Sequence, residues 1–360
     1  MKFKSLFSKK TLGNLALEHR IVMAPLTRCR SSQPGDIPNK LNAEYYQQRA
    51  SAALIISEAT QISPQGKGYA FTPGIHSQEQ IQGWKKVSDA VHSQHAHIFM
   101  QLWHVGRVSH SALQANNALP VAPSAIAVEG QAFTEQGMLD FEIPRALSLN
   151  EIPDIVGQYR QAAINAKQAG LDGVEVHAAN GYLLDQFLKE GTNKRDDSYG
   201  GSIENRCRLI LEVVHAVTEI WGSDRVGIRI SPTGTFNSMT ESNPQALYLY
   251  LIEKLNPFNL AYLHVVEHFG ERSDEQSDFD FVALRHLFNG AYIANGGYTG
   301  ESAEKSIIND HADFVAFGTP FIANPDLPER IKQDAPLNAP DPDTFYGGDA
   351  KGYTDYPSLS

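Results

Sequence analysis

The amino-acid sequence predicts an α/β fold, a closed (β/α)8 TIM barrel, from three observations. Short runs of apolar and β-branched residues recur along the 360-residue chain, and amphipathic helical patterns fall between most of them. Strands that alternate with helices are typical of βαβ units in a parallel sheet. Eight candidate strands in a chain of this length favour a closed barrel over an open doubly wound sheet.

The expected elements follow one another in a regular order. We expect strands at residues 21–24, 54–57, 97–102, 173–177, 226–230, 262–266, 291–294 and 314–317. Helical patterns lie at 78–93, 149–169, 203–221, 244–255 and 301–309. The segment 105–148, rich in Ala, Asn, Pro and Gly, should form a cap inserted after the third strand. The tail 335–360 should be irregular but held in place by its aromatic residues. No Gly- and Ser-rich linker divides the chain, so we expect a single domain of residues 1–360.

The composition argues against several classes of partner. The net charge is −11, from 30 basic and 41 acidic residues, and no run of Lys and Arg is present, which argues against nucleic acids and anionic membranes. No apolar stretch reaches the length of a signal peptide or a membrane span. Two cysteines are too few for an iron–sulfur framework. We place His92 and His95 on the helix before the third strand and His97 at the start of that strand, which disfavours a shared metal. We therefore expect a cytoplasmic protein, a monomer or a homodimer, that holds no metal and acts on small molecules.

Polar and small residues gather where the expected strands end, and the active site of such a barrel lies at those ends. Side chains alternate along a strand, so Glu175 and His177 share one face and His177 should reach the mouth of the barrel. Arg229, between two isoleucines, should also point inward. A strand-end histidine or an arginine in an ion pair is the ordinary structural interpretation, but convergence at one end of the barrel favours a site. Other strand ends contribute Pro25, Leu26, Thr27, Ala59, Gln101 and Trp103.

Two glycine-containing loops follow the last two expected strands. They read IANGGYTGESAEK, with Gly296 and Gly297, and VAFGTPFIANPDL, with Gly318 and Thr319. In this fold these loops commonly offer backbone N–H groups to a phosphate. Gln, Arg and Thr around the same mouth suit flavin mononucleotide (FMN), whose ring needs hydrogen-bonding groups along its pyrimidine edge and a cation near N1. No G-x-G-x-x-G motif follows a strand, so a Rossmann domain is not indicated.

Several longer stretches resemble a known family. They are MAPLTRCRS, SEATQISPQGKGY, QLWHVGR, GVEVHAANGYLLDQFL, YGGSIENR, IRISPTGTFN, YIANGGY, FIANPDLPER and GYTDYP. Over nearly its whole length the chain resembles the Old Yellow Enzyme family of FMN-dependent ene-reductases. It looks most like bacterial members such as N-ethylmaleimide reductase and pentaerythritol tetranitrate reductase. The resemblance implies NADPH or NADH as the reductant and electrophilic alkenes or nitro compounds as substrates.

The resemblance also implies a role for each matching position. His177 and Asn180 would hold the oxygen of an activating carbonyl or nitro group, and Tyr182 would deliver the proton. Tyr69, Trp103 and Tyr346 would shape the substrate pocket. FMN would be bound by Pro25, Leu26, Thr27, Ala59, Gln101, Arg229, Gly296, Gly297, Gly318 and Thr319.

This sequence departs from the family's pattern at one of these positions. Relatives usually carry an Arg that contacts the FMN phosphate where this chain has Thr319. A Thr hydroxyl offers one neutral hydrogen bond, whereas an Arg contact is charge-assisted and often bidentate. The departure predicts weaker binding of the FMN phosphate.

The residues alone leave two other interpretations open. One is a non-catalytic flavin-binding protein. The other is a phosphate-binding aldolase or isomerase on the same barrel, which should place a Schiff-base lysine or a catalytic glutamate at a strand end. No lysine of this sequence occupies such a position.

Overall fold

In the computed structural model, which describes residues 2–268 and 278–359, eight parallel strands form a closed barrel. Strand β15 pairs with β3, and β6 pairs with β11, so the sheet closes on itself. The predicted barrel is therefore confirmed, and each predicted strand agrees with an observed one to within one residue at each end. The barrel strands are β3 (Ile21–Met23), β4 (Leu54–Ile56), β6 (Ile98–Trp103), β11 (Gly173–Ala178), β12 (Val226–Ile230), β13 (Tyr262–Val266), β14 (Ala291–Asn295) and β15 (Phe314–Phe317).

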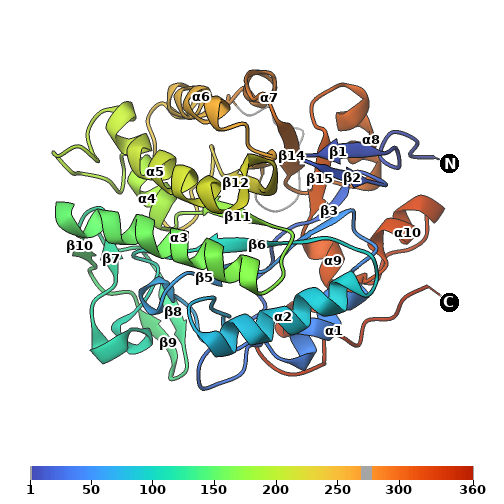
Figure 1. Ribbon diagram of the computed structural model, residues 1–360, viewed down its shortest axis with the longest axis horizontal. Helices are drawn as coiled ribbons and strands as arrows, with labels where there is room; N and C mark the ends of the chain where they lie inside the picture. Colours follow the sequence, from blue (N-terminus) through green and yellow to red (C-terminus); the bar gives the residue numbers. More distant parts are fainter. Residues whose placement is uncertain (1, 269–277, 360) are drawn as a thin grey trace.

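Helices surround the barrel (Figure 1). Val174 and Val176 of β11 belong to the large apolar cluster shared with these helices, as the strand alternation predicts. The helix predicted at 149–169 begins with a short 3-10 turn, and its α-helical part has Pro153 in the first turn, where a missing N–H costs nothing. The helices are α1 (Lys40–Gln48), α2 (Gln78–His92), α3 (Ile152–Gln168), α4 (Leu183–Leu188), α5 (Ile203–Trp221), α6 (Pro244–Leu255), α7 (Phe281–Leu287), α8 (Gly300–Ile308), α9 (Thr319–Ala323) and α10 (Leu327–Gln333).

The placement of His95 on a helix is wrong. Helix α2 ends at His92, and His95 lies beyond it in the left-handed region, with φ 60°. His92 and His97 both approach the carboxylate of Asp172, at 2.9 Å and 3.8 Å. These two histidines therefore interact with a carboxylate at the start of the barrel strands, on the opposite side of the barrel from the strand ends that carry the site.

An N-terminal hairpin that the sequence analysis did not assign covers the N-terminal end of the barrel. Strands β1 (Lys10–Leu12) and β2 (Leu15–Leu17) pair in antiparallel fashion. Their three buried leucines pack with Phe99, Phe314 and other side chains of the barrel interior. This apolar plug fills the lower part of the barrel, so polar interior residues are confined to the upper part, next to the strand ends.

The segment 105–148 forms a compact unit after β6, at the lower left of Figure 1. It contains the antiparallel hairpin β8 (Gln131–Thr134) and β9 (Gly137–Asp140), and the parallel pair β7 (Val121–Ala122) and β10 (Arg145–Ala146). The buried guanidinium of Arg107 ties this unit to the loop after β12. Its Nη1 donates to the carbonyls of Ile126 and Ala127, and its Nη2 donates to that of Asn237.

The C-terminal tail is held by aromatic and arginine contacts, as its composition suggests. Tyr353 stacks on Tyr45 at a centroid distance of 4.1 Å. Arg28 and Arg30, in the loop after β3, donate to five carbonyls of residues 344–352. These contacts fix the loop that carries Thr27. Both cysteines are buried and free, and no helix within the described residues is long and apolar enough to cross a membrane.

Candidate active site

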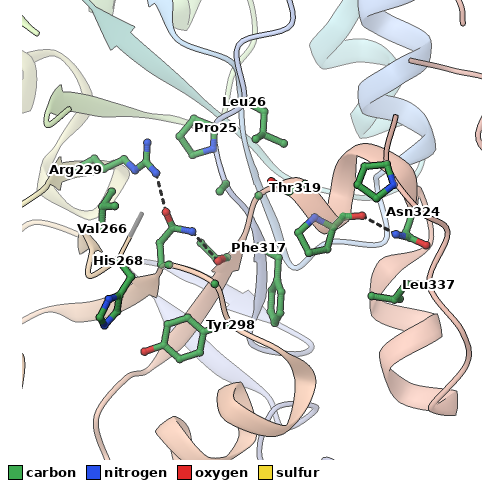
Figure 2. Close-up of a pocket in the computed structure, with 18 of the residues that line it drawn as sticks. Pro25, Leu26, Arg229, Val266, His268, Tyr298, Phe317, Thr319, Asn324 and Leu337 are labelled. Atoms are coloured by element: carbon green, nitrogen blue, oxygen red, sulfur yellow. Dashed lines mark hydrogen bonds between the residues drawn. The ribbon is translucent and has the colours of Figure 1, made fainter. Parts of the chain in front are cut away.

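A pocket of about 590 Å³ opens at the C-terminal ends of β3, β12, β14 and β15. Figure 2 shows Pro25, Leu26 and Arg229 on one side of it, Asn324 and Leu337 on the other, and Thr319 between them. Of the ten residues expected to bind the cofactor, seven line this pocket: Pro25, Leu26, Arg229, Gly296, Gly297, Gly318 and Thr319.

The tail supplies part of the pocket wall, which the sequence analysis missed. Leu337, Asn338 and Pro340 line the pocket beside the loop after β15. Asn324 Oδ1 accepts from the backbone N–H of Asn338 at 2.7 Å, and Asn338 Nδ2 donates to the carbonyl of Ala323 at 2.8 Å. Each of the two segments contains an Asn residue, Asn324 and Asn338, which was the only hint in the sequence. Only the fold shows that these two residues pair.

The loop after β14 needs glycine for two separate reasons. Gly296 has φ 134° and Gly297 has φ 63°, a region that other residues rarely adopt. A Cβ atom on Gly296 would also lie 2.6 Å from the backbone nitrogen of His268. Gly318 differs, because a Cβ there would meet only Leu26 Cδ2, at 3.5 Å. Glycine is therefore required at Gly296 by both its φ and its packing against residue 268, and is favoured at Gly297 by its φ.

One cation is oriented at the edge of the pocket. Arg229 Nη2 donates to Asn295 Oδ1 at 2.8 Å, and Asn295 Nδ2 donates in turn to the carbonyl of Ala316 at 2.9 Å. Burial lowers the pKa of Arg229, and the carboxylate of Glu175 opposes this shift. Among the described residues that line the pocket, Arg229 is the only one with a permanent positive charge, because position 319 holds an exposed threonine.

Beside the pocket, aromatic side chains from three loops and strands pack together. The Tyr182 ring lies 4.9 Å from that of Trp103 and 5.2 Å from that of His177, both edge-on. Tyr69 stacks on Trp103 at 5.7 Å, and its hydroxyl lies 3.1 Å from that of Tyr182. Ala59 packs in the same cluster. The structure therefore brings together four of the residues predicted to contact substrate, although they come from distant parts of the chain.

His177 and Asn180 each present a buried polar atom without a partner. These atoms are His177 Nδ1 and Asn180 Oδ1. Asn180 has φ 61°, and this turn is held by a hydrogen bond from its N–H to Ser231 Oγ, at 2.8 Å. Asn237 Nδ2 donates to the carbonyl of Asn180, also at 2.8 Å. Of these two atoms, the imidazole Nδ1 can donate or accept according to its tautomer, whereas the amide oxygen can only accept.

The protonation states of the cluster follow from burial. Burial, together with Arg229 and His264, lowers the pKa of His177 well below its usual value, so the imidazole is neutral. Burial also raises the pKa of Tyr182 to about 12, which keeps its phenol protonated at neutral pH. Tyr346, with 63% of its surface exposed, lies close enough to add to this shift. It therefore belongs to the rim of the cluster.

Three expected cofactor residues lie outside the lining of the pocket. Thr27 is half-buried and follows Leu26, whereas Ala59 lies in the aromatic cluster. Gln101 points into the barrel interior, where its Nε2 donates to Glu175 Oε1 at 2.7 Å. His177 and Arg229 are paired across neighbouring strands, so the aromatic cluster and the pocket adjoin at this point.

A strand-end carboxylate near the site is turned away from the pocket. Glu58 accepts from the backbone N–H of Arg28 at 3.3 Å and lies 3.4 Å from Asn42 and Tyr46. Burial raises its pKa to about 7. Because Glu58 faces the tail and helix α1 rather than the pocket, it does not supply the catalytic glutamate that an aldolase or isomerase would need.

Known proteins share this fold and much of this sequence. The model of the NADH:flavin oxidoreductase / NADH oxidase family matches residues 5–338. The chain belongs to this family. A putative 12-oxophytodienoate reductase 11 of Oryza sativa subsp. japonica is 46% identical over 356 residues, which cover 97% of this chain and 96% of the relative. Morphinone reductase in complex with tetrahydroNAD is 51% identical with a TM-score of 0.94, covering 99% of this chain and 98% of that one. An Old Yellow Enzyme homologue from Zymomonas mobilis is 41% identical with a TM-score of 0.95, covering 99% and 100%.

These similarities confirm the Old Yellow Enzyme family and, with it, the fold. The protein is an NAD(P)H-dependent FMN oxidoreductase of the ene-reductase type. The pocket fits this cofactor, because glycines of the loops after β14 and β15 line it together with the oriented cation of Arg229. The described residues contain no group of three or more His, Cys, Asp or Glu side chains placed to hold a metal.

Proposed function

We propose that the protein reduces the activated C=C bond of α,β-unsaturated carbonyl compounds with NADPH or NADH, in two alternating half-reactions at one site. The observation that carries this proposal is the grouping of two side chains that can donate an N–H, His177 and Asn180, with the protonated phenol of Tyr182, whose ring centroid lies 5.2 Å from that of His177. They adjoin the pocket through Arg229. When bound, FMN takes a hydride from the nicotinamide and passes it to the alkene.

The cofactor would be held by the residues that the family resemblance implies. Gly296, Gly297, Gly318 and Thr319, which line the pocket, would hold the phosphate through backbone N–H groups. Arg229 would face the N1 side of the ring, since its guanidinium is already oriented by Asn295. The remaining contacts to the ring would come from Pro25, Leu26, Thr27, Ala59 and Gln101.

His177 and Asn180 would hold the carbonyl oxygen of the substrate. A hydride added to the β-carbon places negative charge on this oxygen, so N–H donors aimed at it stabilise the transition state. The neutral imidazole of His177 can donate one N–H, and the side-chain amide of Asn180 can donate another. Each donor of this kind is worth on the order of 3 kcal/mol in the transition state.

Tyr182 would give its hydroxyl proton to the α-carbon. Its O–H bond breaks as the new C–H bond forms, and the phenolate that remains takes a proton from water. The neighbouring hydroxyl of Tyr69, 3.1 Å away, would hydrogen-bond to that phenolate. Trp103 and Tyr346 would complete the walls around the substrate, one buried and the other at the rim. Proton transfer from a positioned side chain typically contributes 10²–10⁴-fold to a rate.

We also propose that nitro compounds or nitrate esters are substrates. A nitro oxygen can occupy the place of the carbonyl oxygen between His177 and Asn180, and its reduction does not require a proton at carbon. Two of the relatives are named for oxo compounds, 12-oxophytodienoate and morphinone, which supports an unsaturated ketone as the principal class.

The test is an anaerobic two-step experiment on the purified holoenzyme. NADPH should bleach the flavin absorbance, and cyclohexenone should then restore it with formation of cyclohexanone. Bleaching without recolouring by any enone or nitro compound would identify a flavin-binding protein that does not reduce these substrates. Failure of both NADPH and NADH to bleach the flavin would contradict the first half-reaction.

A further inference from the structure

A carboxylate is buried inside the barrel, directly below the strand ends. Glu175 of β11 has no exposed surface, and both of its oxygens have partners. Oε1 accepts from Gln101 Nε2 at 2.7 Å, and Oε2 lies 2.8 Å from His264 Nδ1. Because a carboxylate only accepts, Nδ1 of His264 must carry the proton. The carboxylate is thus contacted from two other strands, by Gln101 of β6 and by His264 of β13.

The strand register creates this network. Glu175 lies opposite Gln101 of β6 and opposite Gly227 of β12. The missing side chain of Gly227 leaves room for the ring of Tyr262, since a Cβ there would lie 2.1 Å from a ring carbon. The carboxylate raises the pKa of the Tyr262 phenol further above its usual range, after burial itself. Glu175 therefore lies at the centre of a buried group formed by Gln101, Tyr262 and His264.

The negative charge of Glu175 acts on the positive charge of Arg229. Burial, and then the nearby Arg229, keep the pKa of His264 low despite the carboxylate, so its imidazole is neutral. The attraction of Glu175 is the main influence that raises the pKa of Arg229 against the effect of burial. Water is excluded from this part of the barrel, so charges act on one another over longer distances than at the surface.

We propose that Glu175 is a positioning residue for the cofactor, with two effects. It binds the amide N–H of Gln101, so that the carbonyl oxygen of Gln101 is left to accept from the N–H group on the pyrimidine edge. Its fixed negative charge also offsets the positive charge of Arg229. It therefore lowers the reduction potential of the bound flavin. This inference rests on the proposed placement of the ring over Gln101 and Arg229.

The direction of the effect follows from charge. Two-electron reduction of FMN by a hydride adds negative charge at the N1 side of the ring, which Arg229 stabilises and Glu175 destabilises. Without the carboxylate, the same arginine would favour the reduced cofactor more strongly. Glu175 thus keeps the reduced flavin a good hydride donor to the alkene. The same buried carboxylate affects both the binding of FMN and its reduction potential.

The first test is Glu175→Gln in the holoenzyme. The new amide can accept from Gln101 through its oxygen and donate to His264 Nδ1, provided that the imidazole moves its proton to Nε2, an atom that has no partner. The network can thus be rebuilt without its charge. We expect the flavin two-electron equilibrium, measured against a reference dye, to shift about tenfold toward the reduced form, which is about +30 mV.

Two matched variants separate charge from packing. His264→Asn keeps a donor toward Glu175 and keeps the carboxylate, so the potential should stay at the wild-type value. Glu241→Gln removes a different buried carboxylate, the partner of Arg206 at 2.6 Å, and should lower the melting temperature without moving the potential. A wild-type potential in Glu175→Gln with FMN still bound would overturn the proposal, and so would equal shifts in all three variants.

Two measurements keep the outcomes distinct. If Glu175→Gln loses FMN, the wild-type holoenzyme decides the question by its reduced-minus-oxidised infrared difference spectrum. We expect no carbonyl band of a protonated carboxyl group, and a deuterium-sensitive band of this kind would show that the charge is not fixed and refute the inference. Gln101→Met tests the placement of the flavin ring. An unchanged rate of FMN release and an unchanged reduction potential would show that the ring does not lie over Gln101. That result would contradict the proposed site itself.

Discussion

The two halves of the site are built in different ways. The pocket at the ends of β14 and β15 relies on backbone: Gly296 and Gly297 adopt positive φ values that favour glycine. The aromatic cluster relies on side chains from distant segments, with Tyr69, Trp103 and Tyr182 in mutual contact. Cofactor binding should therefore depend on local backbone shape, whereas reduction of the substrate should depend on individual side-chain groups. Each prediction below changes one half and asks whether the other responds.

The largest effect is expected in the cluster. His177→Ala with Asn180→Ala should slow enone reduction by roughly 10⁴-fold, because each lost oxyanion donor costs about 10²–10³-fold. FMN should stay bound, since neither residue lines the pocket. Stopped-flow measurement of the oxidative half-reaction checks this. The exposed pair His215→Ala with Asn309→Ala is a matched control that should retain the wild-type rate, and an unchanged rate in the first variant would refute the assignment.

Replacing the proton donor should affect one half-reaction only. Tyr182→Phe should slow enone reduction by about 10²-fold, because protonation at carbon then depends on water. Flavin reduction by NADPH should be unaffected, as should reduction of nitro compounds. Tyr69→Phe removes the neighbouring hydroxyl but not the donor, and should have a smaller effect. Equal losses in both half-reactions of Tyr182→Phe would mean that the phenol is structural or contacts the nicotinamide.

A substitution in the pocket should leave the aromatic cluster intact. Gly296→Ala combines a strained φ with a contact of 2.6 Å, and should weaken FMN binding by up to roughly 100-fold, since such strain costs of order 1–3 kcal/mol. Flavin titration of the apoprotein measures this effect. Gly137→Ala also has a positive φ, 107°, with open space around the new methyl group, so it reports strain away from the site. Wild-type FMN affinity in Gly296→Ala would show that this backbone does not contact the cofactor.

A smaller and favourable change is expected at position 319. Thr319→Arg should tighten FMN by roughly 10- to 100-fold, the value of one charged hydrogen bond of about 1.5–3 kcal/mol. Riboflavin, which lacks the phosphate, should bind equally well to both proteins. With Thr319 in place we expect partial loss of flavin during purification. An unchanged ratio of FMN to riboflavin affinity would mean that another cation already serves the phosphate.

The smallest effect concerns pH. The pKa of His177 lies well below its usual value and that of Tyr182 is raised to about 12, so neither group should change protonation between pH 6 and pH 10. The oxidative half-reaction should therefore be flat over this range of about four units. A pH-dependent step near the ordinary histidine value, absent from His177→Ala, would show that the imidazole titrates and contradict its neutral state.

Local patterns in the sequence were sufficient for the parts that local physics controls. The alternation of Val174, Glu175 and Val176 predicted which side chains face the helices and which face the barrel axis, and the structure agrees. The glycines after β14 were expected to offer N–H groups to a phosphate, which stays a prediction, and the structure gives both of them positive φ values. Helix α5 was bounded correctly because Ser202 caps its start and Gly222 ends it.

Long-range contacts were decided only by the tertiary structure. The tail residues Leu337 and Asn338 enter the pocket wall because Asn324 binds them, a pairing between segments whose spacing carries no period. The hairpin before β3 seals the barrel through leucines that look in sequence like ordinary loop residues. Glu175 was expected to face the axis, but its partner His264 lies 89 residues away. Periodicity reports the direction of a side chain along its own element, whereas its partner depends on the register and closure of strands, which no short stretch of sequence encodes.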